Sequence, residues 1–114
     1  MNKDKILILD DEKVVIEAIK KHLKHEDYVI LTGENGQEGL DIYFKERPIL
    51  IILDLKMPVM DGIEFLETIK LTPQSPCSVI VLTGHGSDED MERCFELGIL
   101  AFLHKPFNVY ELKG

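Results

Sequence analysis

The feature that most constrains the fold is an alternation between short apolar runs and amphipathic stretches, repeated five times along 114 residues. The apolar runs have the length of strands, and they largely lack the polar–apolar alternation of a strand with one face in water. Such strands are buried on both faces. Residues 49–53 (ILIIL) form the most continuous run, so we expect them in the centre of a sheet. The five predicted strands are residues 5–9, 28–32, 49–53, 78–83 and 99–103.

Between these runs, apolar residues recur at helical spacing and capping residues mark the helix starts. Val15, Ile19 and Leu23 indicate one face of a first helix over residues 12–24. The other predicted helices are a second that is capped by Asn35 and ends near Glu46, a third that is capped by Asp61, a fourth between Ser87 and Gly98, and a fifth over residues 107–113.

Five strand–helix units with short connections indicate an α/β protein with a doubly wound, five-stranded parallel sheet and right-handed crossovers. The chain is long enough for one hydrophobic core and too short for two, so we expect a single domain over residues 1–114. The last predicted helix has about two turns, where about three are usual. Its amphipathic pattern stops at Gly114, so we favour a truncated helix over a natural end.

Composition excludes several classes of protein. The net charge of −8 argues against nucleic-acid binding by this segment, because phosphate backbones require clustered Lys and Arg. No apolar run approaches the length that spans a bilayer, and the N-terminus does not have the pattern of a signal peptide. Cys77 and Cys94 lack a metal-ligand spacing, and we expect two buried, reduced thiols. We therefore expect a cytoplasmic protein without a membrane partner.

Polar side chains follow four of the predicted strands at the point where each strand ends. In a doubly wound parallel sheet, the carboxyl ends of the strands meet at one edge, where ligands bind. We therefore expect these side chains to converge in one shallow pocket. They are Asp10 and Asp11 after the first strand, Asp54 after the third, Thr83 and Gly84 after the fourth, and His104, Lys105 and Pro106 after the fifth.

Three carboxylates in one pocket repel each other unless a cation offsets their charge, and Mg2+ is the hard, oxygen-seeking ion that suits them. Asp54 then has the setting of a carboxylate nucleophile for a phosphoryl group. Lys105 can pair with one phosphoryl oxygen and Thr83 can donate a hydrogen bond to another.

Each of these residues has a simpler interpretation when it is taken alone. Asp11 suits the N-cap of the first helix, and Asp54 suits the first residue of a loop. Thr83 with Gly84, and Lys105 with Pro106, suit ordinary turns. The joint occurrence of acids, a hydroxyl and an ammonium at four separate strand ends favours the functional interpretation.

The chain resembles the receiver domain of bacterial two-component response regulators, the fold shared with chemotaxis regulators. The resemblance is carried by ILILDDE (6–12), IILDLKMPVMDG (51–62), VIVLTG (79–84) and AFLHKPF (101–107), and it covers nearly the whole chain. It implies a flavodoxin-like strand order of 2-1-3-4-5. It also implies that a histidine kinase or a phosphotransfer protein transfers a phosphoryl group to this domain.

The resemblance implies the metal ligands. Asp54 corresponds to the phosphorylated aspartate, and Asp11 and Asp54 correspond to direct ligands of Mg2+ or Mn2+. Asp10 corresponds to an acid that acts through water. Lys56 corresponds to the position whose backbone carbonyl completes the ligand set.

The resemblance also implies a switch. Thr83 corresponds to the switch hydroxyl, Lys105 to the phosphate-pairing lysine, and Pro106 to a cis-proline. Phe102 corresponds to the aromatic residue whose rotamer accompanies activation, without the hydroxyl of the tyrosine often found there. Gly84 stands where a small residue leaves room for the phosphoryl group.

Two positions are expected to tune the lifetime of the phosphorylated state. In domains of this kind, side chains two residues after the phosphoacceptor and two after the switch hydroxyl flank the path of attacking water. Here these residues are Lys56 and His85. We expect the bulky Lys56 to hinder that water and lengthen the lifetime. For His85 the direction is open, and it also suits a solvated loop.

The predicted output is a change in the face formed by the fourth strand, fourth helix and fifth strand, passed to an output domain or partner protein. Receiver faces of this kind often dimerise, so a homodimer is one expectation. The alternative function is a pseudo-receiver, an interaction module without phosphotransfer. A phosphatase resembling haloacid dehalogenases would have an Asp at Lys56, so we expect no enzyme activity beyond self-directed phosphoryl transfer and hydrolysis.

Overall fold

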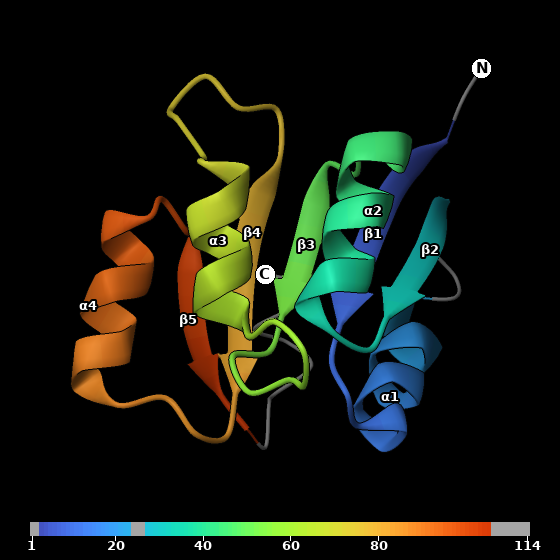
Figure 1. Cartoon of the computed structure of the whole chain (residues 1–114). Helices are drawn as coiled ribbons and strands as arrows, with labels where there is room; N and C mark the ends of the chain where they lie inside the picture. Colours follow the sequence, from blue (N-terminus) through green and yellow to red (C-terminus); the bar gives the residue numbers. More distant parts are fainter. Residues whose placement is uncertain (1–2, 24–26, 106–114) are drawn as a thin grey trace.

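The computed structural model describes residues 3–23 and 27–105, and it shows a parallel sheet flanked by helices (Figure 1). The strand order is β2-β1-β3-β4-β5, which confirms the predicted topology. The elements are β1 (Asp4–Leu9), α1 (Lys13–Leu23), β2 (Tyr28–Gly33), α2 (Gly36–Glu46), β3 (Leu50–Leu53), α3 (Gly62–Ile69), β4 (Ser78–Thr83), α4 (Asp88–Glu96) and β5 (Ala101–His104).

The two faces of the sheet carry separate apolar clusters because side chains alternate along each strand. In β1, Leu7 and Leu9 belong to a cluster with Phe65 of α3, whereas Ile8 belongs to a cluster with Ile19 of α1. All five of these side chains are fully buried. Burial on both faces explains why this strand reads as a continuous apolar run.

Capping residues start three of the helices, as the sequence predicts. The Asn35 side chain accepts a hydrogen bond from the backbone N–H of Glu38. Asp61 forms a reciprocal capping box with Glu64 at the start of α3, and Ser87 forms one with Asp90 at the start of α4. These local contacts fix where α3 and α4 leave the loops that follow β3 and β4.

The predicted limits of the fifth strand differ from the structure by two residues at its start and one at its end. Gly98 has a φ of +96°, and the N–H of Ile99 still bonds to the carbonyl oxygen of Cys94 in the last turn of α4. The helix ending therefore occupies the residue that the apolar pattern assigned to the strand. Pro106 and the predicted helix over residues 107–113 lie outside the described residues.

The two cysteines are buried and form no disulfide, as expected. Burial raises the pKa of both the Cys77 and the Cys94 thiol to about 11. Buried thiols with raised pKa values carry very little of the reactive thiolate at neutral pH. Within residues 3–23 and 27–105, no helix has the length and apolar character that a membrane crossing requires.

Candidate functional site

The carboxylates of Asp10 and Asp54 meet because β1 and β3 are paired in register. Leu9 lies opposite Leu53, so the next residue of each strand leaves the sheet at the same edge. The N–H of Asp54 donates to the carbonyl oxygen of Leu9 at 2.9 Å. Each aspartate is only 2% exposed. Two buried carboxylates at neighbouring strand ends require a nearby cation to offset their repulsion.

Four carboxylates gather at this edge. One oxygen each from Asp10, Asp11, Glu12 and Asp54 lies within 4.8 Å of the others. Sequence reasoning did not include Glu12 in the site, although it directly follows the acid pair. The Oδ1 atom of Asp10, not that of Asp11, accepts a hydrogen bond from the N–H of Glu12 at 2.8 Å where α1 begins. The side chain of Asp11 is exposed and remains available for another ligand.

The cluster fits a divalent cation. Asp54 Oδ1 is the buried side-chain atom that lacks a hydrogen-bond partner within the described part of the chain. A buried carboxylate oxygen without a partner is costly, and a cation would relieve that cost. Mg2+ binds carboxylate oxygens and keeps several of its waters. Two buried and two exposed carboxylates at one edge of the sheet suit such an ion, because the exposed side leaves room for water.

Lys105 lies directly against the acid cluster. Its Nζ atom is 2.9 Å from Asp10 Oδ2, 2.9 Å from Glu12 Oε1 and 3.5 Å from Asp54 Oδ2. The backbone N–H of Lys105 donates to the carbonyl oxygen of Thr83, which fixes the end of β5 beside β4. The strand pairing thus brings the ammonium to the same edge as the acids.

The charges at this edge shift each other's pKa. Burial raises the pKa of Asp10 above its ordinary value, against the opposing pull of Lys105. Lys105 lowers the pKa of Glu12. Burial by itself would lower the pKa of Lys105, but its hydrogen bonds to Glu12 and Asp10 outweigh that effect, and the pKa lies above its ordinary value. The ammonium therefore stays charged throughout the physiological pH range.

The Thr83 hydroxyl lies at the end of β4 and is fully buried. Its Oγ1 atom accepts a hydrogen bond from the backbone N–H of His85 at 3.2 Å. This is the short turn that the simpler interpretation of Thr83 and Gly84 predicts. The turn and the functional interpretation are compatible, because a hydroxyl that accepts one hydrogen bond can still donate another.

Phe102 lies beside this turn and packs against Gly86, a residue that sequence reasoning missed. Phe102 is opposite Val81 in the β4–β5 pairing and packs, partly buried, against the apolar cluster that contains Phe65 of α3. A Cβ atom at Gly86 would lie 2.4 Å from Cζ of Phe102 and 3.1 Å from Cγ2 of Thr83. The ring position therefore depends on glycine at residue 86.

The remaining predicted residues lie around this edge. Lys56 and His85 are exposed, in the loops that follow β3 and β4. His85 adds to the lowering of the pKa of Glu12, for which Lys105 is the main cause. A Cβ atom at Gly84 would make only ordinary contact with the Lys105 side chain, at 3.8 and 3.9 Å. Pro106 lies outside the described residues, so its isomer stays a prediction.

The loop after Asp54 contains a strained turn. The N–H of Met60 donates to the carbonyl oxygen of Pro58 at 2.7 Å, two residues earlier, and Val59 between them has a φ of +68°. Positive φ is unfavourable for a β-branched residue. The carbonyl oxygen of Met60 accepts a hydrogen bond from the N–H of Gly36 at 2.8 Å, which ties the turn to the start of α2.

Replacing Val59 with glycine is expected to raise the free energy of unfolding by about 1 kcal/mol, because glycine adopts positive φ without steric cost. Val59 is 82% exposed, so little buried apolar area is lost. Urea titration of wild type and Val59→Gly measures the change. Val59→Ala is the control, and it should gain less because alanine keeps a Cβ atom. A Val59→Gly variant less stable than wild type would contradict the strain.

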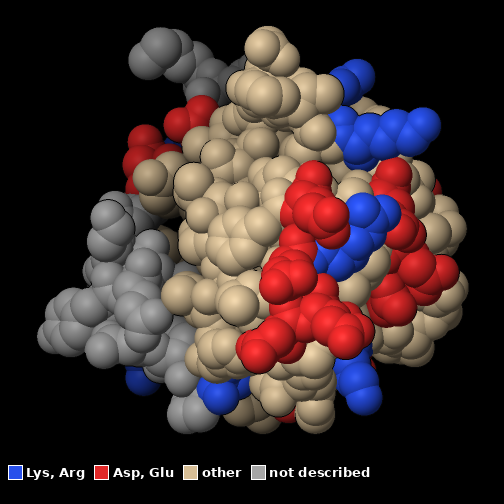
Figure 2. Space-filling view, turned by 90° about the vertical axis from the view of Figure 1, so that its left-hand side faces the viewer, with Lys and Arg blue, Asp and Glu red and all other residues tan. Residues whose placement is uncertain are grey.

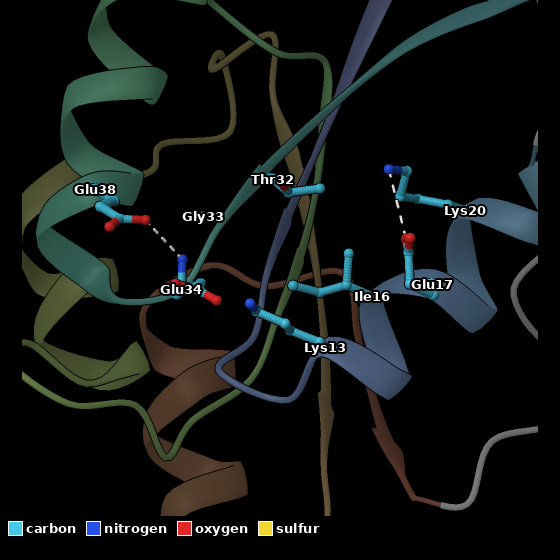
Figure 3. A pocket seen from close by; sticks show the side chains of 8 residues that line it. All are labelled: Lys13, Ile16, Glu17, Lys20, Thr32, Gly33, Glu34 and Glu38. Carbon is cyan, nitrogen blue, oxygen red and sulfur yellow. Dashed lines mark hydrogen bonds and ion pairs between the residues drawn. The ribbon is translucent and has the colours of Figure 1, made fainter.

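A separate groove of about 390 Å³ lies between α1 and the end of β2 (Figure 3). Lys13 and Ile16 line it, with the Lys20–Glu17 ion pair on one side. On the other side, the backbone N–H of Glu34 donates to the Glu38 carboxylate at 2.9 Å. The groove contains none of the four clustered carboxylates. The candidate site is therefore the acid cluster at the carboxyl ends of the strands, and not this groove.

Comparison with known proteins agrees with the fold and identifies the family. Residues 6–114 match the family described as the response regulator receiver domain. Sporulation initiation phosphotransferase F of Bacillus subtilis (strain 168) is 37% identical over 113 residues, which is 99% of this chain and 90% of that protein. The transcriptional regulatory protein GlrR of Escherichia coli (strain K12) is 38% identical over 102 residues, which is 89% of this chain but only 22% of that protein.

A solved receiver-domain structure has the same fold. The signal receiver domain of a putative Luxo repressor protein from Vibrio parahaemolyticus superimposes with a TM-score of 0.89 and 34% identity, covering 98% of this chain and 85% of that one. The fold and the family match together define a receiver domain of two-component signalling. The chain belongs to the response regulator receiver domain family.

Proposed function

We propose that this domain accepts a phosphoryl group on Asp54, in the cytoplasm and with Mg2+ or Mn2+ bound, from a phosphohistidine on a histidine kinase or a phosphotransfer protein. The observation that carries the proposal is the buried Asp54 carboxylate. Its Oδ1 atom lacks a partner within the described residues, and its Oδ2 atom lies 3.5 Å from the Lys105 ammonium. Such a carboxylate is poised for a cation and for an incoming phosphoryl group.

In the proposed transfer, a carboxylate oxygen of Asp54 attacks the phosphorus atom in line with the bond to the donor nitrogen. The oxygen–phosphorus bond forms as the phosphorus–nitrogen bond breaks. The electron pair of the broken bond stays on the imidazole nitrogen of the donor. Asp54 then carries an acyl phosphate, and the later attack of water on phosphorus releases inorganic phosphate and restores the carboxylate.

The divalent cation, when bound, would neutralise charge on the phosphoryl oxygens. Asp11 and Asp54 would hold it directly, and the backbone carbonyl of Lys56 would complete the ligand set. Both carboxylate oxygens of Asp10 already have partners, in the N–H of Glu12 and the Nζ atom of Lys105. This supports contact of Asp10 with the cation through water. Lys105 would pair with a phosphoryl oxygen.

We propose that phosphorylation is transmitted by a conformational change in the turn after β4. The phosphoryl group would attract the hydroxyl of Thr83, which now accepts the N–H of His85. Movement of Thr83 changes the space beside Gly86, where the ring of Phe102 packs. We therefore propose Thr83 and Phe102 as the switch, which alters the α4–β5 face. Lys56 and His85, exposed beside this site, remain the proposed residues that tune the phosphorylated lifetime.

The α4 side is the proposed output surface, for an output domain, a partner protein or a second copy of the domain. Figure 2 shows acidic groups gathered on this side, with a basic group between them. Asp88, Glu89 and Asp90 form the first turn of α4, and Arg93 pairs with Glu67 of α3 at 3.0 Å. Phe95 and Leu100 are 48% and 65% exposed. An acidic surface with exposed apolar residues suits a protein partner more than nucleic acid.

The test is phosphorylation by acetyl phosphate with Mg2+, followed by intact-mass spectrometry. Wild type is expected to gain the mass of one phosphoryl group, and Asp54→Asn none, because an amide is not a nucleophile of this kind. Asp61→Asn is the matched control, since Asp61 caps α3 outside the acid cluster, and it should gain the group. Wild type without a mass gain would instead favour an interaction module without phosphotransfer.

A further inference from the structure

The three hydrogen-bond donors of the Lys105 ammonium all face carboxylates. An ammonium has three N–H donors, and Asp10, Glu12 and Asp54 lie at 2.9, 2.9 and 3.5 Å from Nζ. The Lys105 side chain is only 14% exposed, so water has little access to the donors. A phosphoryl oxygen that binds Lys105 must therefore displace one of these three carboxylates.

Glu12 is the carboxylate that can separate from the Lys105 ammonium at the smallest cost in free energy. The side chains of Asp10 and Asp54 are 3% and 2% exposed, whereas that of Glu12 is 57% exposed. A buried carboxylate released from its cation has no water to take its place. A carboxylate at the surface is rehydrated as it leaves, and the net strength of an exposed pair is small.

We propose that Glu12 is a positioning residue that holds Lys105 in the unphosphorylated protein and competes with the incoming phosphoryl group for its ammonium. The inference rests on the proposed function of Asp54. Glu12 acts through Lys105 and need not touch the phosphoryl group. It also carries negative charge on an exposed side chain beside the acid cluster, and that charge opposes the approach of an anionic donor.

The effect is measured as the initial rate of phosphorylation by acetyl phosphate, at a Mg2+ concentration that saturates each variant. Glu12→Gln is expected to react about threefold faster than wild type, the range for loss of one partly exposed ion pair. Glu34→Gln is the matched control. It removes the same charge from the same edge of the sheet, at the end of β2, where the described contacts of Lys105 do not include it (Figure 3). It should react at the wild-type rate.

Glu12→Asp separates the contact from the charge. Aspartate keeps the negative charge but is one methylene shorter, so it cannot reach Lys105 from the same backbone position. A rate close to that of Glu12→Gln supports the proposed contact. A rate equal to wild type overturns it, because charge alone would then explain the effect.

A second measurement needs neither metal nor phosphodonor. The ammonium protons of Lys105 should be protected from exchange with water in wild type, so that its side-chain nitrogen gives a resolved NMR correlation in the metal-free protein. Glu12→Gln should shift or broaden this correlation, while Glu34→Gln should not. An unchanged Lys105 signal in Glu12→Gln would show that the pair is absent in solution, and it would overturn the inference.

The outcomes separate the two proposals. If wild type is phosphorylated on Asp54 and Glu12→Gln is no faster, the inference fails and the proposed function stands. If Glu12→Gln is slower at saturating Mg2+, Glu12 assists the reaction, and the inference again fails alone. If wild type gains no phosphoryl group, both fail together.

Discussion

Gly62→Ala is expected to unfold at a temperature roughly 10–20 °C below wild type, corresponding to a loss of about 3 kcal/mol in a domain of this size. A Cβ atom at Gly62 would lie 2.5 Å from the backbone oxygen of Asp54 and 2.9 Å from Cα of Leu55. Both are backbone atoms, which cannot rotate away as a side chain can. The start of α3 would have to move away from the end of β3.

The direction of this effect opposes helix propensity. Gly62 is the first residue of α3, and in a helix alanine is favoured over glycine by up to about 1 kcal/mol. Propensity therefore predicts a more stable variant, whereas the backbone contact predicts a much less stable one. The displaced backbone includes the carbonyl of Asp54, so we also expect slower phosphorylation of the folded fraction.

Gly84→Ala is the matched control for Gly62→Ala. The added Cβ atom would meet only Lys105, at 3.8 and 3.9 Å, which is ordinary van der Waals contact. We expect its free energy of unfolding to stay within about 0.5 kcal/mol of wild type. Thermal melts followed by circular dichroism compare the three proteins. Equal melting temperatures for Gly62→Ala and wild type would show that the loop after β3 shifts freely and that Gly62 is not closely packed.

Lys105→Met is expected to be phosphorylated on the order of 100-fold more slowly than wild type, the range for loss of one preorganised group that stabilises transition-state charge. Methionine keeps much of the aliphatic length of lysine and removes the ammonium. The same change should tighten Mg2+ binding, because the ammonium that repels the dication is gone. Slower chemistry together with tighter metal binding distinguishes a lost charge from a damaged site.

The stability of Lys105→Met gives a third readout. Without metal at neutral pH, we expect a loss of about 2 kcal/mol, since three carboxylates lose their cation. Burial raises the pKa of Asp10, and Lys105 opposes that rise, so the pKa of Asp10 climbs further in the variant. A carboxyl group with a raised pKa favours the folded state at low pH and disfavours it as the pH rises through that pKa.

The stability deficit of Lys105→Met should therefore be largest at neutral pH and should shrink as Asp10, whose pKa is raised, becomes protonated. Urea titrations between neutral pH and about pH 4, the range in which carboxyl groups titrate, follow this change. Lys3→Met is the matched control, because Lys3 pairs with Asp27 at the surface and should show little effect. A deficit independent of pH would mean that lost packing, and not lost charge, destabilises the variant.

The order and type of the elements could be read from the sequence because both are set by local patterns. Residues 78–83 form β4 as predicted, since a run bounded by turn residues and buried on both faces leaves little choice of limits. The start of β5 could not be predicted, because the positive φ of Gly98 and the bond from Ile99 to Cys94 extend the helix ending into the apolar run.

By itself, the sequence determined which residues stand at the strand ends. Parallel strands have their carboxyl ends at one edge, so the sequence pattern alone predicts that Asp10, Asp54 and Lys105 lie together. Only the tertiary structure decided what each side chain touches. Glu12 and Lys105 are 93 positions apart, and their contact depends on strand register and on how far two flexible side chains reach. The backbone of Gly62 lies against that of Asp54 because the loop after β3 folds back on the strand end, and this close packing leaves no periodic pattern in the sequence.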